Sequence, residues 1–441
     1  MAVNLDKSDL KDIQTIVLCD RPSPYVGTYI LLRIDEKNDG IKMFKTLVSE
    51  ITTADCEKSS SQFQWFNVAF TCEGLKKIGI PSESLDSFPP EFKEGMVSRA
   101  KLLNDVANSA PSAWEVPFGT KDIHVALVLY AENNTLFQEL LKKTRAIYEI
   151  LPGISVLSEL KVQSLSNGRT HMGFVDGISN PTIEGLVSDA TNSIKAGEFL
   201  LGKLDEKGLI NPEPQPESLR NNGSYLIIRK LHMHVAAFRK YTKTYSSNKT
   251  EEELLAAKMV GRWSSGTPLS LSPEKDDLTV SSNNKLRNDF VYGNDPNGLK
   301  CPLGAHIRRA NPRDGLKDSI VDINIHRILR RSTIYGPPLE EGVLEDDGQD
   351  RGIIFAGICS SISRQYEFIK TNWLNDGNFV ELSTEEDPIV GNKKGVGEYT
   401  IPNKPIRKRL YDLPNFSTTR GGEYFFVPSI SALKWLLQLN Q

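Results

Sequence analysis

The chain repeats short stretches of its own sequence. Residues 27–34 (Gly-Thr-Tyr-Ile-Leu-Leu-Arg-Ile) return as residues 223–230 (Gly-Ser-Tyr-Leu-Ile-Ile-Arg-Lys), and both predict short buried strands. The apolar stretches 124–130 and 352–358 each lead into a helical pattern, at 135–141 and 361–373. In the second of these, Ile362, Tyr366, Ile369 and Trp373 recur on one face of a helix. Two repeats in the same order predict a duplicated α+β domain.

A proline-rich stretch, residues 211–218, lies between the two halves. Proline has no backbone N–H and clashes within a helix, so this stretch cannot form a helix interior or a central strand. We therefore predict two domains, residues 1–210 and residues 211–441. The first includes the segment Gly-Phe-Val-Asp-Gly at residues 173–177.

The composition is that of an ordinary globular protein. Of 441 residues, 39% are hydrophobic and 25% are charged, and the formal net charge is −3. Such a charge gives no global attraction to nucleic acid or to an anionic membrane, and no apolar stretch has the length of a membrane span. Five scattered cysteines without a CxxC pair argue against a disulfide scaffold. With no basic region followed by an apolar run at the start, we expect a cytoplasmic protein.

Three segments carry chemistry, and they follow one another in a fixed order. Gly173 and Gly177 flank a single acid, Asp176, and glycine lets a carboxylate be aimed into a pocket whose wall is mostly backbone. Residues 301–313 (Cys-Pro-Leu-Gly-Ala-His-Ile-Arg-Arg-Ala-Asn-Pro-Arg) hold one histidine among arginines, and residues 330–337 read Arg-Arg-Ser-Thr-Ile-Tyr-Gly-Pro. Together these segments resemble the signature of the dye-decolorizing peroxidases, a family of haem enzymes.

The resemblance implies both a fold and a function. The implied fold is α+β, with two ferredoxin-like domains whose antiparallel sheets pack together as an α+β barrel. The implied activity is that of a haem b peroxidase, which reduces hydrogen peroxide and oxidises bulky aromatic dyes or phenolic compounds. A homo-oligomer is also consistent with the family. Two alternatives stay open: a haem-binding or iron-extracting (deferrochelatase-like) protein that uses the same pocket, and a structural protein without a cofactor.

His306 is the candidate iron ligand among the six histidines, because Ala-His-Ile-Arg matches the family's proximal ligand. Thiolate ligation by Cys301 is the alternative that the sequence itself offers. By resemblance, Asp387 accepts the other ring proton of His306, which makes the ligand more basic. His232 and His234 share one face of a predicted strand and could also bind a metal, but no third ligand is evident nearby.

Asp176 and Arg330 are the residues that the resemblance implies for cleavage of the O–O bond. A carboxylate is ionised at neutral pH and can move a proton between the peroxide oxygens, while an arginine supplies a permanent positive charge. If residues 325–331 form a strand, Arg330 and Arg331 face opposite ways, and period alone cannot choose between them. The family's arginine lies six residues before the glycine of Tyr-Gly, which selects Arg330.

Four further residues are predicted around the cofactor. Arg309, near His306 in the sequence, is our first choice to hold a haem propionate, from a pool that includes Arg308 and Arg313. Phe355, in an apolar strand, is expected to form part of the pocket wall. Tyr335 and Trp373 are candidates to carry oxidising equivalents as radicals to bulky substrates at the surface, although core packing is the favoured explanation of both, most of all for Trp373 on the apolar face of its helix.

Overall fold

A computed structural model describes residues 5–55, 63–186, 193–316 and 321–439. The strands are β1 (Val26–Ile34), β2 (Gln64–Phe70), β3 (Val125–Ala131), β4 (Ile154–Gln163), β5 (Ser224–Met233), β6 (Leu329–Arg330), β7 (Thr333–Tyr335), β8 (Gly352–Cys359), β9 (Gly397–Ile401), β10 (Lys408–Leu413) and β11 (Ser417–Val427). The α-helices are α1 (Lys7–Asp12), α2 (Thr15–Leu18), α3 (Lys37–Leu47), α4 (Cys72–Lys77), α5 (Ser82–Asp86), α6 (Pro90–Arg99), α7 (Asn134–Tyr148), α8 (Glu217–Arg220), α9 (Val235–Thr244), α10 (Lys249–Val260), α11 (Leu278–Ser282), α12 (His306–Ala310) and α13 (Ile430–Gln438). The chain also contains two π-helical segments, η8 (Ile362–Glu367) and η9 (Ile369–Leu374). Short 3-10 turns are η1 (Val48–Glu50), η2 (Ala107–Ser109), η3 (Pro111–Ala113), η4 (Ala196–Glu198), η5 (Leu286–Asn288), η6 (Arg313–Leu316), η7 (Asn324–His326) and η10 (Phe379–Glu381).

One antiparallel sheet carries both halves of the chain. Its order is β4-β1-β3-β2-β11-β5-β8-β6, with β7 also paired to β8, while β9 and β10 form a separate hairpin. Four strands of the first half, β4-β1-β3-β2, are followed by β11-β5-β8-β6. When the short strands β6 and β7, which both pair with β8, are counted as one, each unit has the order last, first, third and second strand. The two units meet where Phe426 of β11 pairs with Phe70 of β2. This arrangement confirms the duplicated ferredoxin-like fold.

The repeated stretches form equivalent elements. The predicted strand 27–34 lies within β1, and the predicted strand 223–230 overlaps β5, which begins one residue later; these are the first strands of the two units. The stretches 124–130 and 352–358 correspond to β3 and β8. The helical pattern at 135–141 lies in α7, which begins where the Asn133 side chain accepts a bond from the Leu136 N–H. Its buried residues include Phe137, Leu140, Leu141 and Tyr148, one face of the helix, and this face fixes α7 on the sheet.

Two local predictions need correction. Residues 361–373 are helical, with all four predicted face residues buried, but the backbone is wound as the two π-helical segments η8 and η9 rather than as a regular α-helix. The predicted strand at 325–331 is reduced to β6, because η7 occupies residues 324–326. There the His326 ring stacks on Phe368 at 3.7 Å between centroids, a long-range contact that no local pattern reveals.

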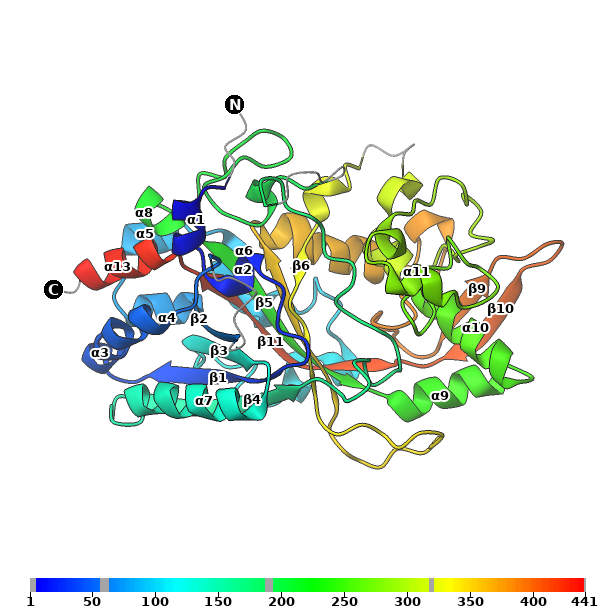
Figure 1. Ribbon diagram of the computed structural model, residues 1–441, viewed down its shortest axis with the longest axis horizontal. Helices are drawn as coiled ribbons and strands as arrows, with labels where there is room; N and C mark the ends of the chain where they lie inside the picture. Colours follow the sequence, from blue (N-terminus) through cyan, green and yellow to red (C-terminus); the bar gives the residue numbers. More distant parts are fainter. Residues whose placement is uncertain (1–4, 56–62, 187–192, 317–320, 440–441) are drawn as a thin grey trace.

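The connection from β4 to β5 crosses between the two units (Figure 1). This connection contains the Gly-Phe-Val-Asp-Gly segment. It also contains the predicted domain boundary between residues 210 and 211, and this boundary stays a prediction. In Figure 1 the first unit, with α3 and α7, lies on the left, and α9, α10 and the β9–β10 hairpin lie on the right. Cys56, one of the scattered cysteines, lies outside the described residues.

Candidate active site

A largely apolar cavity lies in the second unit. It is lined by residues of β5, β8 and β11, of the Gly-Phe-Val-Asp-Gly segment, and of the stretches around His306 and Ile389. Its apolar members include Phe174, Val175, Leu231, Met233, Ile307, Ile353, Phe355, Leu374 and Val390. The predicted residues His306, Asp176, Arg330 and Phe355 all line this same cavity. An apolar cavity with a few polar groups is the usual form of a cofactor site.

His306 is the first residue of α12, and its ring is oriented by a buried acid. The Nδ1 atom of His306 lies 2.9 Å from Oδ2 of Asp387, a fully buried residue. The other oxygen of Asp387 accepts bonds from the N–H groups of Ile389 and Val390, at 2.9 and 2.8 Å. Burial raises the pKa of Asp387, but the charge and the hydrogen bond of His306 outweigh it and bring the value to about 2. An ionised carboxylate only accepts hydrogen bonds, so Nδ1 donates, and in the neutral imidazole Nε2 keeps the lone pair that a metal needs.

Asp176 and Arg330 form an ion pair at the cavity. The Arg330 Nη1 atom lies 3.5 Å from Oδ1 of Asp176, and its Nη2 atom donates to the Ser179 hydroxyl at 2.8 Å. The backbone of Arg330 is held by the Asn180 side chain, which accepts from its N–H and donates to its carbonyl. Burial raises the pKa of Asp176, but the Arg330 charge and the Gly177 N–H bring it below its ordinary value. Asp176 is therefore ionised at neutral pH.

Arg331 points away from the cavity. Its side chain is 2% exposed; Nε donates to the Ile16 carbonyl at 3.2 Å, and Nη1 lies 3.2 Å from Asp20. The two consecutive arginines thus face opposite sides, as the strand alternation predicts, and it is Arg330 that lines the cavity.

Arg309 does not reach the cavity, which departs from our expectation that it holds a propionate. It is fully buried, and its guanidinium donates to the backbone carbonyls of Trp373, Glu385 and Asp376. These three hydrogen bonds hold the end of η9 and the segment that follows it against α12. Arg308 is likewise engaged elsewhere, with Asp295 and the Cys301 carbonyl.

Arg327 is a cavity arginine that the sequence reasoning missed. It lines the cavity, and within the described residues its guanidinium has no ion-pair or hydrogen-bond partner. Burial, together with the nearby charges of Arg313 and Arg330, lowers the pKa of Arg327 to about 10. A partly buried cation beside other cations is unfavourable unless an anion accompanies it. Strand alternation would place Arg327 on the side of Arg331, so no local signal in the sequence pointed to it; Arg327 follows η7 and precedes β6, so it is not bound by that alternation.

The remaining candidates lie outside the cavity lining. Tyr335 is 7% exposed, and its hydroxyl donates to Asp350 at 3.1 Å. Trp373 is 3% exposed and packs edge-on against Phe368. Cys301 is fully buried in a separate apolar cluster, where burial raises the pKa of its thiol to about 12. A thiol of such high pKa is poorly suited to act as a thiolate ligand.

Comparison with known proteins places the chain in a family. The family model described as DyP dimeric alpha+beta barrel domain matches residues 28–164, and the one described as Dyp-type peroxidase, C-terminal, matches residues 167–385. A dye-decolorizing peroxidase of Mycena epipterygia is 32% identical, covering 88% of this chain and 78% of that protein. Dye-decolorizing peroxidase msp1 of Mycetinis scorodonius is 30% identical, covering 85% and 76%. The chain belongs to the dye-decolorizing peroxidase family.

The solved structures agree with this placement. An ancestral D-type dye decolorizing peroxidase superposes with a TM-score of 0.85 at 29% identity, covering 98% of this chain and 99% of that one. A dye-decolorizing peroxidase in complex with 2,6-dimethoxyphenol gives the same TM-score at 26% identity, covering 97% and 99%. The chain is therefore a peroxidase, an oxidoreductase that belongs to a family of haem enzymes. In the described part of the chain, no helix is both long enough and apolar enough to cross a membrane.

Proposed function

We propose that the chain is a haem b peroxidase in which His306 binds the iron and in which Asp176 and Arg330 promote cleavage of hydrogen peroxide. The observation that carries the proposal is that one cavity contains both an imidazole fixed by a buried carboxylate and a separate acid–cation pair. A protein that only stores or transfers haem has no need of the second pair. Nothing in the cavity favours the iron-extracting alternative.

Three features of the cavity suit haem. Its walls are apolar, as a porphyrin ring requires. The Nε2 atom of His306 is left available because Nδ1 is bound to Asp387. The guanidinium of Arg327, which has no partner in the described part of the chain, suits a propionate, so we assign to Arg327 the role first expected of Arg309. Bound haem would supply the iron with which peroxide reacts and the capacity to store the oxidising equivalents.

The residues of the chain would handle the proton and the charge. The Asp176 carboxylate, ionised because Arg330 lowers its pKa, accepts a proton from one oxygen of hydrogen peroxide and returns it to the other. Arg330 stays charged throughout and stabilises the negative charge that develops as the O–O bond breaks. Ser179 and Asn180 hold Arg330 in place, so the positive charge is oriented before peroxide arrives. Aromatic dyes or phenolic compounds are the proposed reductants.

An absorption spectrum of the purified chain, before and after hydrogen peroxide, tests this function. We expect one haem per chain with a Soret band, a rapid spectral change on adding peroxide, and a return to the starting spectrum when a phenol or dye is oxidised. A haem spectrum that peroxide leaves unchanged would contradict the proposal. Release of iron with retention of a metal-free porphyrin would instead support the iron-extracting alternative.

Tyr335 and Trp373 are proposed to carry oxidising equivalents to substrates that do not enter the cavity. Asp350 accepts the Tyr335 hydroxyl bond and so is placed to take the phenol proton when the ring is oxidised. We expect Tyr335→Phe and Trp373→Phe to slow the oxidation of bulky dyes while sparing small phenols. Steady-state rates on both substrate classes measure this, with Tyr411→Phe, an exposed tyrosine on β10, as the control. Equal loss on dyes and phenols would rule the route out.

A further inference from the structure

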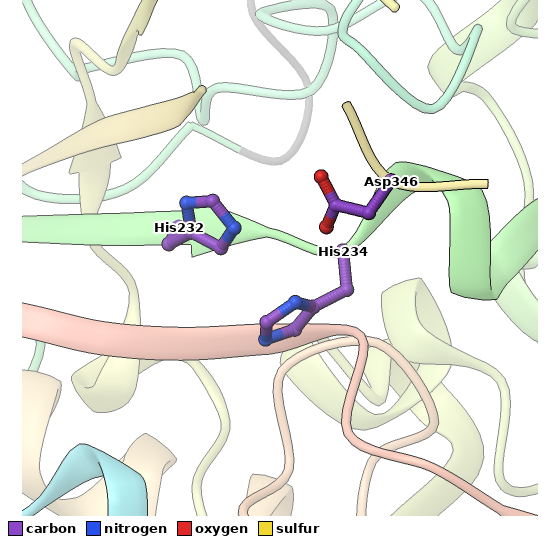
Figure 2. Close-up of side chains that lie close together, drawn as sticks. All are labelled: His232, His234 and Asp346. Atoms are coloured by element: carbon purple, nitrogen blue, oxygen red, sulfur yellow. The ribbon is translucent and has the colours of Figure 1, made fainter. Parts of the chain in front are cut away.

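Two histidines and one aspartate converge on the face of β5 that is turned away from the cavity. Leu231 and Met233 line the cavity, so the alternating residue His232 faces the other way. His234 directly follows the strand, and its ring lies 4.9 Å from the His232 ring between centroids. Asp346, from the loop between β7 and β8, reaches the same point (Figure 2). One potential ligand atom from each of the three residues lies within 4.8 Å of the others. The third ligand that was not evident in the sequence is therefore supplied by the loop between β7 and β8.

Both imidazole rings are already oriented for metal binding. The Nδ1 atom of His232 is bonded to the Asp350 carboxylate at 3.0 Å, and the Nε2 atom of His234 is bonded to the Thr418 hydroxyl at 2.7 Å. These bonds leave Nε2 of His232 and Nδ1 of His234, and Figure 2 shows a nitrogen of each ring turned toward the shared space. Metal-binding histidines characteristically have their second nitrogen held in this way, which fixes the tautomer and the ring direction.

The aspartate is held in a comparable manner. Its Oδ1 atom accepts a bond from the Gly348 N–H at 2.9 Å, which leaves Oδ2 as the available ligand atom. Donors bound to one tetrahedral zinc lie roughly 3.3 Å apart, given bonds of about 2.0–2.1 Å. Starting from separations of at most 4.8 Å, each pair of donor atoms has to close by no more than about 1.5 Å.

We propose that His232, His234 and Asp346 form a binding site for one divalent transition-metal ion of the zinc class, separate from the haem cavity. Two imidazole nitrogens and one carboxylate oxygen suit Zn²⁺, with water as a fourth ligand, and also Cu²⁺. Magnesium and calcium prefer sites made of oxygen atoms alone and are not expected to compete. The bound ion would join the loop between β7 and β8 to the junction of β5 and α9, stabilising the native state without taking part in the peroxide reaction.

Calorimetric titration of the chelator-treated holoprotein with ZnCl₂ tests the site. We expect one equivalent to bind, and His234→Gln or Asp346→Asn each to weaken binding at least tenfold. Glu345→Gln is the matched control, because it removes a carboxylate next to Asp346 from an exposed residue whose ion pair is with Lys240. This variant should bind Zn²⁺ as the parent does. Thr418→Val should weaken binding about tenfold, because it leaves the outer nitrogen of His234 unheld.

Copper gives a second measurement that does not depend on affinity. In the electron paramagnetic resonance spectrum of the Cu²⁺-loaded holoprotein, hyperfine splitting from two imidazole nitrogens is expected, and His234→Gln should reduce it to one. The haem Soret band should stay unchanged during both titrations. The proposal is overturned if no Zn²⁺ binds, if His234→Gln and Asp346→Asn bind it as tightly as the parent, or if the copper spectrum shows no nitrogen coupling.

Discussion

Replacing Arg330 with leucine is expected to slow the reaction with hydrogen peroxide by about 10²–10³-fold while haem stays bound. Arg330 contributes a fixed charge beside Asp176, and this charge acts on the O–O bond as it breaks rather than on the cofactor. Loss of one such preorganised group typically costs about 2.7–4 kcal/mol in the transition state. Stopped-flow measurement of the haem spectrum after mixing with peroxide gives the rate directly, and the Soret absorbance gives the occupancy.

The same variant is also expected to change how the rate of the peroxide reaction depends on pH. The charge of Arg330 lowers the pKa of Asp176, so the ionised form of the acid persists into the acidic range and the reaction is lost only as the pH falls through that lowered value. Without Arg330 the pKa of Asp176 rises, because burial then acts with less opposition. The acid limb of the pH–rate profile should therefore move to higher pH in Arg330→Leu and much less in Arg330→Lys. A slower rate with an unmoved acid limb would show that Asp176 is not the proton acceptor.

Arg331→Leu is the matched control for this experiment. Arg331 is the next residue along the chain, but it donates to the Ile16 carbonyl and faces Asp20 instead of the cavity. Its loss leaves a buried carbonyl unsatisfied, so we expect a lower melting temperature with a normal peroxide rate per bound haem. If Arg331→Leu abolished the reaction and Arg330→Leu did not, the roles of the two residues would be reversed.

The sequence predicted what depends on local pattern and on motif order. The strands β1, β3, β5 and β8 are buried apolar runs, and their repetition predicted the duplication that the sheet order confirms. Asp176 and Arg330 are separated by more than 100 positions in the sequence, with His306 between them, yet all three line one cavity. The sequence could predict this because each of the three belongs to a recognisable motif. The bond from His306 to Asp387 was expected only from resemblance, since nothing local relates residues 81 positions apart.

What the sequence did not predict depends on partners brought in by the tertiary fold. Arg309 is close to His306 along the chain, but carbonyls from residues 373–385 capture its guanidinium, and Arg327 lines the cavity instead. The pair His232 and His234 was visible, whereas Asp346 comes from a loop 112 residues beyond His234. The π-helical winding of residues 362–374 likewise has no counterpart in the apolar spacing, which fits an α-helix equally well.

The second large effect is expected from His306→Gly, which removes the proposed bond from the chain to the iron. Haem affinity should fall by more than the 10–100-fold typical of losing a residue that merely supports a metal ligand, and the spectrum of any bound haem should change. Added imidazole should restore the parent spectrum by filling the space of the lost ring. Haem titration of the haem-free protein, followed at the Soret band, measures both effects.

Two variants separate ligation from the other contributions to haem binding. Arg327→Leu removes a charge proposed to pair with a propionate, worth about 1.5–3 kcal/mol, so affinity should fall roughly 10–150-fold with an unchanged spectrum of the bound fraction. His326→Gln is the control for His306, because His326 also lines the cavity but bonds through Nδ1 to the Arg364 carbonyl and stacks on Phe368. It should keep its haem spectrum. Loss of haem in His326→Gln with retention in His306→Gly would move the iron to the other histidine, and Asp387 would then have no role in tuning it.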